Sequence, residues 1–195
     1  MNMRAVFAAT LALAVLAAPW ALALQEAKKA DKPAGAPPVP TPAAEINTLS
    51  VFDGSWTCEG AMPPGPMGPG GKMKSRVKSK RDLGGFWQTG TVKGSMEGMP
   101  EMEGMFHITY EPGSKSYVML WVDNMGGFSQ TTSTGWEGDK LVFSGEGTMG
   151  GKKMMGRDTF TKNADGTLRH AWEMQMDGKW VPMGDETCRK DGGGK

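Results

Sequence analysis

The sequence has few of the residues that carry catalysis, metal binding or nucleic-acid recognition. Its 195 residues include two histidines and two cysteines, and 22 basic side chains against 21 acidic ones leave a formal charge of +1. This even balance gives no electrostatic footprint for nucleic acid or an anionic membrane. The histidines and cysteines lack the paired spacing of a zinc site. The sequence also lacks a Gly-x-Ser-x-Gly elbow, a phosphate-binding loop and a His-Glu-x-x-His run, so we expect no enzyme.

Long helices are excluded as well. The chain contains 29 glycines and 13 prolines, the two residues that a helix interior tolerates least. This composition rules out a coiled coil or a long helical bundle, and it favours an all-β domain with many turns. The chain length suits a single domain of ordinary size.

The one long apolar run lies at the N-terminus. Arg4 precedes an alanine- and leucine-rich stretch, and Ala21-Leu22-Ala23 offers small residues where a signal peptidase cuts. We interpret residues 1–23 as a secretory signal peptide. Pro19 interrupts the apolar run and no basic stop-transfer cluster adjoins it, so we expect no transmembrane segment after cleavage. The predicted location is therefore outside the cytoplasm, either periplasmic or extracellular.

Composition divides the rest of the chain into three parts. Residues 24–44 are rich in lysine, alanine and proline with almost no apolar bulk, which is typical of a flexible linker that cannot bury enough surface to become ordered. Residues 45–190 carry the folded domain, and residues 191–195 form a disordered tail. A short helix around Ala44–Val51 is compatible with a barrel domain and would cap the mouth of the barrel.

The folded region is a series of short runs rich in β-branched and aromatic residues, separated by turns that contain glycine. Strands joined by tight turns run antiparallel to their neighbours. An even number of them can close into a single up-and-down barrel that leaves no exposed edge. The ten predicted strands are Phe52–Gly60, Lys72–Arg81, Phe86–Met96, Met105–Glu111, Tyr117–Asp123, Ser129–Trp136, Leu141–Gly147, Lys153–Thr161, Leu168–Met176 and Trp180–Cys188.

Alternation within these runs favours a barrel interior that is a cavity. In Leu168–Met176 every second residue, including His170 and Trp172, shares one face. The run Ser129–Thr134 is polar on both faces, so it would point hydroxyl groups inward, and a polar barrel interior is more often a cavity than a filled core. The run Tyr117–Asp123 is bulky on both faces, so we expect a loop to cover its outer side.

Several stretches of the folded region have a distinctive order and spacing. They are Gly54-Ser55-Trp56, Asp82-Leu83-Gly84-Gly85-Phe86-Trp87, Gly98-Met99-Pro100, Trp121-Val122-Asp123-Asn124-Met125-Gly126, Trp136-Glu137-Gly138-Asp139-Lys140-Leu141 and Arg157-Asp158-Thr159-Phe160. The first resembles the Gly-x-Trp motif that opens calycin barrels. Together, across Thr48–Lys190, the stretches resemble a family of secreted bacterial proteins, domain of unknown function 1579. The resemblance implies a lipocalin-like barrel and an activity that the family leaves open.

The resemblance also implies roles at the two ends of the domain. In lipocalins the tryptophan of the Gly-x-Trp motif packs at the closed end of the barrel beneath a basic residue of the last strand. This gives Gly54 and Trp56 a structural role here and makes Arg189 the nearest candidate for the basic residue, although its neighbour Cys188 must then face the opposite side. Ten-stranded relatives that bind haem place a histidine on the final strand. This sequence has Thr187 and Cys188 there, so we expect no haem cofactor.

The two cysteines, Cys58 and Cys188, lie in the first and last predicted strands. In an oxidising compartment such a pair predicts a disulfide, because closure of the barrel makes those strands neighbours. Antiparallel pairing would place Cys58, late in its strand, opposite the beginning of the last strand. The bridge therefore requires a stagger between the two strands.

Methionine is abundant, with 17 residues in the chain. Met96, Met99, Met102 and Met105 recur at every third position through a turn rich in glutamate and glycine. Thioethers are soft ligands that select Cu(I), so a copper-binding loop is one interpretation of this spacing. The other interpretation is that methionine fills irregular space and contacts apolar ligands.

The function predicted from the sequence is the binding of a small apolar or amphiphilic molecule in the lumen of the barrel. Trp121, Trp172 and His170 would line the walls, and Asp123 and Arg157 would orient the ligand through polar contacts. Two alternatives stay open. One is soft-metal binding through the methionine loop, and the other is a non-catalytic envelope protein whose barrel is filled by its own side chains.

Overall fold

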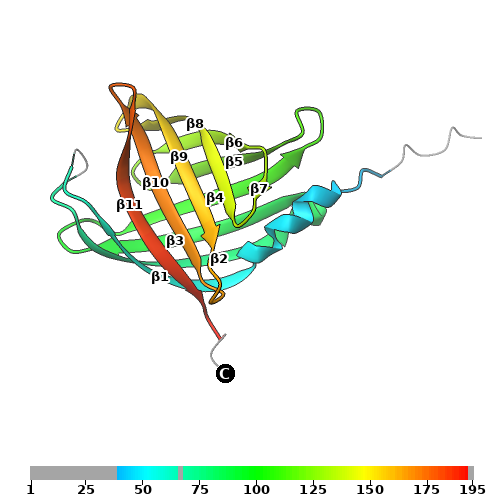
Figure 1. Cartoon of the computed structure of the whole chain (residues 1–195), viewed down its shortest axis with the longest axis horizontal. Helices are drawn as coiled ribbons and strands as arrows, with labels where there is room; N and C mark the ends of the chain where they lie inside the picture. The colour runs from blue at the N-terminus through cyan, green and yellow to red at the C-terminus, as the bar shows by residue number, and fades with distance from the viewer. Residues whose placement is uncertain (1–38, 66–67, 193–195) are drawn as a thin grey trace, which may run out of the picture. The chain divides into compact units, whose positions relative to one another are not determined.

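The computed structural model describes residues 39–65 and 68–192, so the predicted signal peptide and most of the predicted linker lie outside the described residues. The described chain forms one antiparallel sheet of eleven strands. Ten of them, β1 to β6 and β8 to β11, close into a barrel through the pairings β1–β11 and β6–β8 (Figure 1). The all-β, up-and-down barrel predicted from the turn spacing is confirmed.

The strands lie close to their predicted positions. The run Ser129–Trp136 is the exception: it divides into two strands, because Gly135 has a φ of 114° that a regular strand cannot continue through. The strands are β1 (Gly54–Met62), β2 (Gly71–Asp82), β3 (Trp87–Met96), β4 (Met102–Glu111), β5 (Ser116–Asp123), β6 (Phe128–Ser133), β7 (Trp136–Glu137), β8 (Lys140–Met149), β9 (Lys152–Lys162), β10 (Leu168–Met176) and β11 (Lys179–Lys190).

A short 3₁₀ helix, η1 (Ala44–Phe52), closes one end of the barrel (Figure 1). Its buried residues Ile46, Leu49 and Phe52 are three positions apart. Because a 3₁₀ helix has three residues per turn, these side chains lie in one line along the helix. They join the buried core of the barrel. The helix predicted around Ala44–Val51 is therefore present, and it ends at Phe52. A second 3₁₀ turn, η2 (Leu83–Gly85), links β2 to β3.

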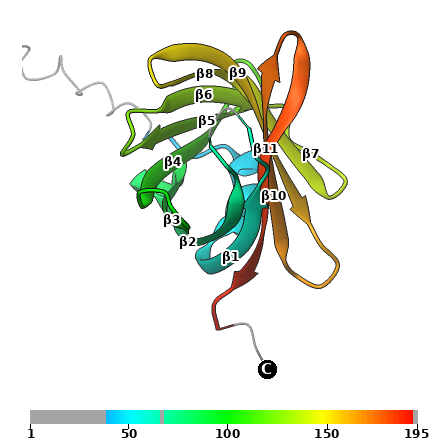
Figure 2. The ribbon, with the colours of Figure 1, turned by 90° about the vertical axis from the view of Figure 1, so that its left-hand side faces the viewer.

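Side chains of the barrel hold η1 in place by bonding to its carbonyl groups. Trp56 Nε1 in β1 donates a hydrogen bond of 3.0 Å to the carbonyl oxygen of Phe52. Tyr117 Oη in β5 donates one of 2.9 Å to the carbonyl oxygen of Glu45. We call the end covered by η1 the closed end. The opposite end, formed by the loops that follow β1, β3, β5, β8 and β10, is called the mouth and faces the viewer in Figure 2.

The buried core lies at the closed end. Its members are apolar or sulfur-containing residues that alternate along the strands with residues facing outward. Besides the three residues of η1 they are Trp56, Cys58, Ile108, Tyr117, Met119, Leu141, Phe143, Leu168 and Cys188. The core thus fills the half of the barrel next to η1.

The basic residue beside Trp56 is Lys190 and not Arg189. Lys190 is paired directly with Trp56 across the β1–β11 seam, and its Nζ lies 5.5 Å from the centre of the indole ring, within cation–π range. Arg189 is paired with Thr57 instead. Adjacent residues of a regular strand face opposite sides, so the alternation that places Cys188 inside also places Lys190 inside and Arg189 outside.

The β1–β11 seam carries the predicted disulfide. Cys58 lies directly opposite Cys188, and their sulfur atoms are bonded across a separation of 130 residues. The stagger that this bridge requires is present, because β1 pairs only with Asp185–Lys190, the second half of β11. The first half of β11 pairs with β10.

The barrel wall extends one residue beyond β11. Asp191, which composition assigns to the tail, donates its backbone N–H to the carbonyl oxygen of Ser55 at 2.8 Å. Its Oδ1 accepts a hydrogen bond of 2.8 Å from Thr57 Oγ1. Residues 193–195 of the predicted tail lie outside the described residues.

Two glycines allow the strands to meet closely at the seams β1–β11 and β6–β8. A Cβ atom at Gly60 would lie 2.0 Å from the carbonyl oxygen of Asp185 in β11. A Cβ atom at Gly145 in β8 would lie 2.6 Å from the carbonyl oxygen of Gln130 in β6. Both distances are far inside van der Waals contact, so the present approach of these strands requires glycine.

Replacement of Gly145 by alanine should therefore destabilise the barrel, because the backbone of β6 or β8 has to shift. We expect a loss of about 1–3 kcal/mol in the free energy of unfolding, measured by urea denaturation. Gly156→Ala is the matched control: it also lies in a strand, and the atom nearest to its added Cβ is a carbonyl oxygen at 4.0 Å. The control should be neutral or slightly stabilising. Equal losses in the two variants would contradict this account of the seam.

Loss of the disulfide should lower stability without changing the fold. A bridge that closes 130 residues contributes up to about 5 kcal/mol in the chain-entropy model. The double variant Cys58→Ser/Cys188→Ser should melt about 10 °C lower and keep its far-ultraviolet circular dichroism spectrum. An unchanged melting temperature would show that the seam does not need the covalent link.

Candidate functional site

The lumen has a filled half and a half that solvent reaches. Alternate residues of each strand face the lumen, and we call these positions the inner face. Next to η1 the inner face is the buried core described above. Toward the mouth its residues become partly exposed, among them Val92, Phe106, Trp121, Met154 and Trp172. The inner face is therefore less buried toward the mouth than at the core.

Three large aromatic side chains line the wall of the mouth half. Each ring occupies the space above a glycine of the neighbouring strand, where a Cβ atom would lie 2.2–2.3 Å from a ring atom. The pairs are Phe106 over Gly90, Trp121 over Gly104 and Trp172 over Gly184. The rings thus lie against the wall instead of projecting across the lumen.

A charged cluster lies on the inner face where the two halves meet. His170 Nε2 in β10 lies 2.9 Å from Asp158 Oδ1 in β9, and its Nδ1 lies 3.6 Å from Glu186 Oε1 in β11. Glu186 Oε2 accepts a hydrogen bond of 2.7 Å from Ser75 Oγ in β2. The side chains of His170 and Asp158 are 23% and 26% exposed, whereas that of Glu186 is 7% exposed. The cluster therefore forms the polar floor of the solvent-reached half.

The imidazole of this cluster is charged at neutral pH. Burial by itself lowers the pKa of His170, but the carboxylates of Asp158 and Glu186 outweigh burial and raise the pKa from 6.5 to about 9. The ring also stacks on Phe160, with centroids 4.5 Å apart. One imidazolium faces two carboxylates, so the floor of the lumen carries a net negative charge.

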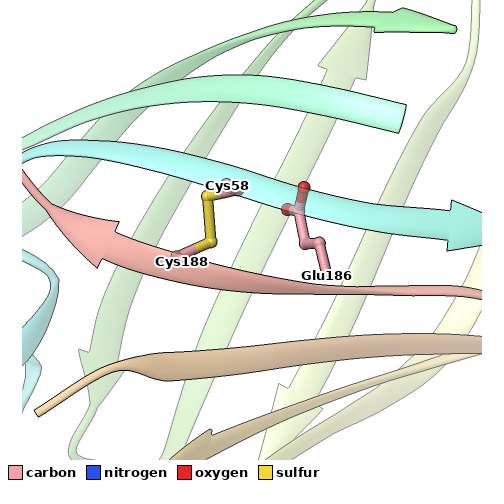
Figure 3. Close-up of side chains that lie close together, drawn as sticks. All are labelled: Cys58, Glu186 and Cys188. Atoms are coloured by element: carbon pink, nitrogen blue, oxygen red, sulfur yellow. A yellow bond between two sulfur atoms is a disulfide. The ribbon is translucent and has the colours of Figure 1, made fainter. Parts of the chain in front are cut away.

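Glu186 also packs beside the disulfide (Figure 3). Among the described residues, Cys58, Glu186 and Cys188 bring their donor atoms within 4.8 Å of one another. The two sulfur atoms are bonded to each other, so the oxidised protein has no thiolate metal site here. The contact instead ties the charged cluster to the β1–β11 seam.

Asp123 lies at the mouth and orders the turn after β5. Its Oδ2 accepts a hydrogen bond of 3.0 Å from Trp121 Nε1. Its Oδ1 accepts bonds of 2.9 and 2.8 Å from the backbone N–H groups of Met125 and Gly127. Both oxygens are therefore engaged within the protein, and the residue fixes the indole of Trp121 against the wall.

Arg157 lies on the outer face, which corrects its predicted place in the lumen. Its guanidinium forms an ion pair of 2.6 Å with Glu173, the residue directly opposite in β10. It also lies 4.5 Å from the centre of the Trp180 ring. The alternation that turns Asp158 inward turns its neighbour Arg157 outward. The other four predicted wall residues, Trp121, Asp123, His170 and Trp172, lie on the inner face.

Two buried polar side chains share one level of the closed half. Gln88 and Thr131 are 0% and 2% exposed. Gln88 Oε1 and Thr131 Oγ1 have no hydrogen-bond partner among the described residues, which is rare for buried polar atoms. The pairings from Gln88 through Ile108 and Met119 to Thr131 place them in the same row. The polar run Ser129–Thr134 points the side chains of Ser129, Thr131 and Ser133 inward, as expected for alternate residues. No signal in the sequence indicated Gln88.

The structure separates the four methionines of the predicted copper loop. Met96 ends β3 and Met102 begins β4, both on the inner face, and Met99 lies in the turn between them. Met105 lies on the outer face and is 44% exposed. The barrel wall stands between Met105 and the other three thioethers, so the four cannot surround one ion.

The outer side of β5 is exposed near the mouth. Val122 is 47% exposed, and its paired neighbours Met105 and Phe128 are 44% and 56% exposed. The prediction that a loop covers this side of β5 is therefore wrong at its mouth end. The run is apolar on its outer face without a covering segment among the described residues.

Two shallow hollows lie on the outer side of the barrel, and neither includes the charged cluster. The first lies over β9, β10 and β11 beside the end of β1, and the second lies over β2, β3 and β4. Their outward-facing lining residues include Thr159, Arg169, Ala171 and Asp185 in the first and Lys78, Lys80, Thr89, Thr91, Met105 and His107 in the second. The lining of the first hollow also includes Met62, Trp172 and Gly184, so this hollow reaches residues that the inner face contributes near the mouth.

Comparison with known proteins identifies the family. Residues 41–190 match the family described as "Protein of unknown function (DUF1579)". The chain belongs to this family. The resemblance seen in the sequence motifs is thereby confirmed. The description of DUF1579 names no activity, and no curated protein matches the chain.

A solved structure shares the fold of this DUF1579 chain. The crystal structure of Rv2717c from M. tuberculosis is similar with a TM-score of 0.61 and 17% sequence identity, over 77% of this chain and 99% of that one. Identity this low shows a common fold and no more. In the described part of the chain, no helix is long and apolar enough to span a membrane.

Glu186 is a candidate site residue that is not among those predicted from the sequence. A signal for it was present in the last strand, where Gly184, Glu186 and Cys188 alternate with Asp185 and Thr187. Once Cys188 is placed inside by the disulfide, Glu186 must also face inward. The inward position of the Glu186 carboxylate could therefore be derived from the predicted disulfide.

Stability should decrease as the pH rises through the weakly alkaline range. The pKa of His170 is 6.5 in the unfolded chain and about 9 in the folded one. The folded state binds this proton more tightly, so its contribution is complete below about pH 6.5 and is lost as the pH rises through about 9. This difference in pKa between the folded and unfolded states contributes about 3 kcal/mol to the free energy of unfolding. Urea denaturation between about pH 6 and pH 10 measures it.

In the variant His170→Gln the free energy of unfolding should no longer fall between about pH 6.5 and pH 9, because the group that titrates is absent. His107→Gln is the control, since His107 is the other histidine of the chain and lies on the outer face beside Trp87. The control should keep the decrease. The same pH dependence in the His170 variant as in the wild type would show that other groups cause it.

Proposed function

We propose that this protein is an exported carrier that binds one small apolar or amphiphilic molecule in the mouth half of its lumen. The observation that carries the proposal is the arrangement of the inner face: partly exposed Trp121, Trp172 and Phe106 stand above a charged floor, and a filled core closes the far end. A concave apolar wall with a few convergent polar groups is the usual form of a small-molecule site.

The wall favours a flexible or flat apolar group. Each aromatic ring lies over a glycine, so none of the three rings crosses the lumen. Methionines on the inner face, including Met154 and Met174, are partly exposed to the same space. Their flexible thioether side chains adapt to ligands of different shape. The ligand therefore needs apolar bulk more than a particular outline.

The floor favours a polar head that donates hydrogen bonds or carries positive charge. Asp158 and Glu186 are acceptors, and together they exceed the single positive charge of His170. The negatively charged floor would repel a carboxylate or phosphate head, which is also negative. An amine, an alcohol or an amide fits the cluster, with its apolar chain extending past Trp172 toward the mouth.

The protonation and hydrogen bonding of the candidate catalytic groups, His170 and Ser75, favour binding without catalysis. A histidine with a pKa of about 9 is protonated at neutral pH, so it cannot act as a general base there. Ser75 Oγ donates its hydrogen bond to the carboxylate of Glu186, which is a weaker base than a neutral imidazole. Export to the periplasm or the extracellular space is supported by the disulfide, since such bonds persist in oxidising compartments.

Binding can be tested with the matched twelve-carbon probes dodecylamine, dodecanol and dodecanoate, each below its solubility limit and below any micelle concentration. We expect the amine and the alcohol to quench tryptophan fluorescence and raise the melting temperature, and the carboxylate to bind about 10-fold more weakly. Glu186→Gln should reduce the preference for the amine. Asp185→Asn is the matched control, because Asp185 is the adjacent carboxylate, faces outward and pairs with Arg169.

Each part of the proposal can fail separately. If none of the three probes changes either the fluorescence or the melting temperature, the barrel is filled and the carrier proposal is wrong. If dodecanoate binds as well as dodecylamine, or if the Asp185 variant alters the preference as much as the Glu186 variant, the charged floor does not face the ligand head.

A further inference from the structure

Methionines gather at one corner of the mouth, where β1 ends, β2 begins, β3 ends and β4 begins. Met73 in β2 is paired directly with Met96 in β3. Met62 ends β1 and Met102 begins β4, on the same inner face. Directly opposed side chains have Cβ atoms about 5 Å apart and diagonal ones about 7 Å apart, which is within reach of these long side chains. All four are partly exposed to the lumen.

Two glycines provide the space in which these thioethers meet. Gly71 in β2 is paired with Met62, and Gly94 in β3 is paired with Met102. The Sδ atom of Met96 lies 3.9 Å from the place of a Cβ at Gly71, and the methyl carbon of Met102 lies 3.2 Å from that of Gly94. Side chains at these two positions would block the corner. Because glycine has no side chain, the methionine side chains can occupy this space.

A fifth thioether comes from the turn between β3 and β4. The backbone N–H of Met99 donates to the carbonyl oxygen of Met96 at 3.1 Å, and this bond closes the turn. Met99 Sδ then lies 3.9 Å from the place of a Cβ at Gly68, in the loop between β1 and β2. The turn therefore brings the Met99 thioether next to the loop between β1 and β2, beside the corner.

The surroundings of the corner favour a soft cation of low charge. Both cysteines are bonded to each other, so thioethers are the soft sulfur donors that this region offers. The inner-face neighbours Ser75, Val77 and Val92 carry no charge, and Ser75 links the corner to Glu186 through its hydrogen bond. Glu186 lies in the same cross-strand row as Met73, with Gly60 between them, so the net negative floor adjoins the corner. A monovalent cation at the corner would be attracted by it.

We propose that this corner binds one Cu(I) ion, with Ag(I) as its redox-inert equivalent, through the thioethers of Met73, Met96 and Met102, which Met62 and Met99 supplement. Neutral sulfur ligands select soft ions, whereas Zn²⁺ and Cu²⁺ prefer nitrogen and oxygen donors. The site differs from the loop predicted from the sequence, because it replaces the outward Met105 with residues of β1 and β2. It is independent of amphiphile binding.

The test is a titration of the mature protein with Ag(I), and with Cu(I) under anaerobic conditions against a chromophoric Cu(I) chelator. We expect one ion per chain by native mass spectrometry, a shell of sulfur ligands by X-ray absorption, and a rise in melting temperature by mass action. Zn²⁺ should produce no rise. The absence of Cu(I) and Ag(I) binding, or binding of Zn²⁺ with equal affinity, would overturn the proposal.

Paired variants locate the site. Met73→Leu/Met96→Leu preserves volume and apolarity and should weaken Ag(I) binding at least about 10-fold. Met105→Leu/Met155→Leu removes two methionines that are 44% and 39% exposed on the outer face, and it should bind Ag(I) as the wild type does. Equal affinities in the two double variants would overturn the assignment. Dodecylamine binding should survive in both, so failure of the metal site and failure of the carrier proposal are distinguishable.

Discussion

The pairing of β1 with β11 is the contact on which the rest of the structure depends. It turns an open meander into a barrel and brings the ends of the domain together. Its register places Cys58 opposite Cys188 and Lys190 beside Trp56. The same register turns Glu186 inward, within reach of His170. A slip of one residue would move every one of these side chains to the other face of the wall, so fold and site are fixed by one pairing.

The second constraint is the asymmetry that η1 introduces. A symmetrical ten-stranded barrel would have two similar ends, but η1 delivers three apolar side chains to one of them. That end is consequently a filled core. The charged cluster lies at the boundary of the core, where burial is deep enough for the ion pairs to raise the pKa of His170 to about 9. Farther out, the inner face is aromatic and methionine-rich and only partly buried. Burial of the inner face thus decreases from the core to the mouth, so the two ends of the lumen differ.

The sequence predicts the elements of this fold better than it predicts their faces. Strand positions and turns depend on local patterns, so the ten strands and the short helix could be recognised, and compartment and strand order indicated the disulfide. The face of a residue depends on register, and register is set by partners far away in the chain. Arg157, Arg189 and Met105 were therefore assigned to the inside or to a ligand set and lie outside. The corner of methionines was not visible because its members come from four strands.

The central claim is that the mouth half of the barrel is a binding site and not a filled interior. Native mass spectrometry of the protein purified from its own host under mild conditions tests it most directly, because a guest held between the wall and the charged floor should travel with the chain. We expect a one-to-one adduct with a small organic molecule, which dodecylamine displaces. A spectrum of the bare chain alone, both as purified and after mixing with dodecylamine, would contradict it.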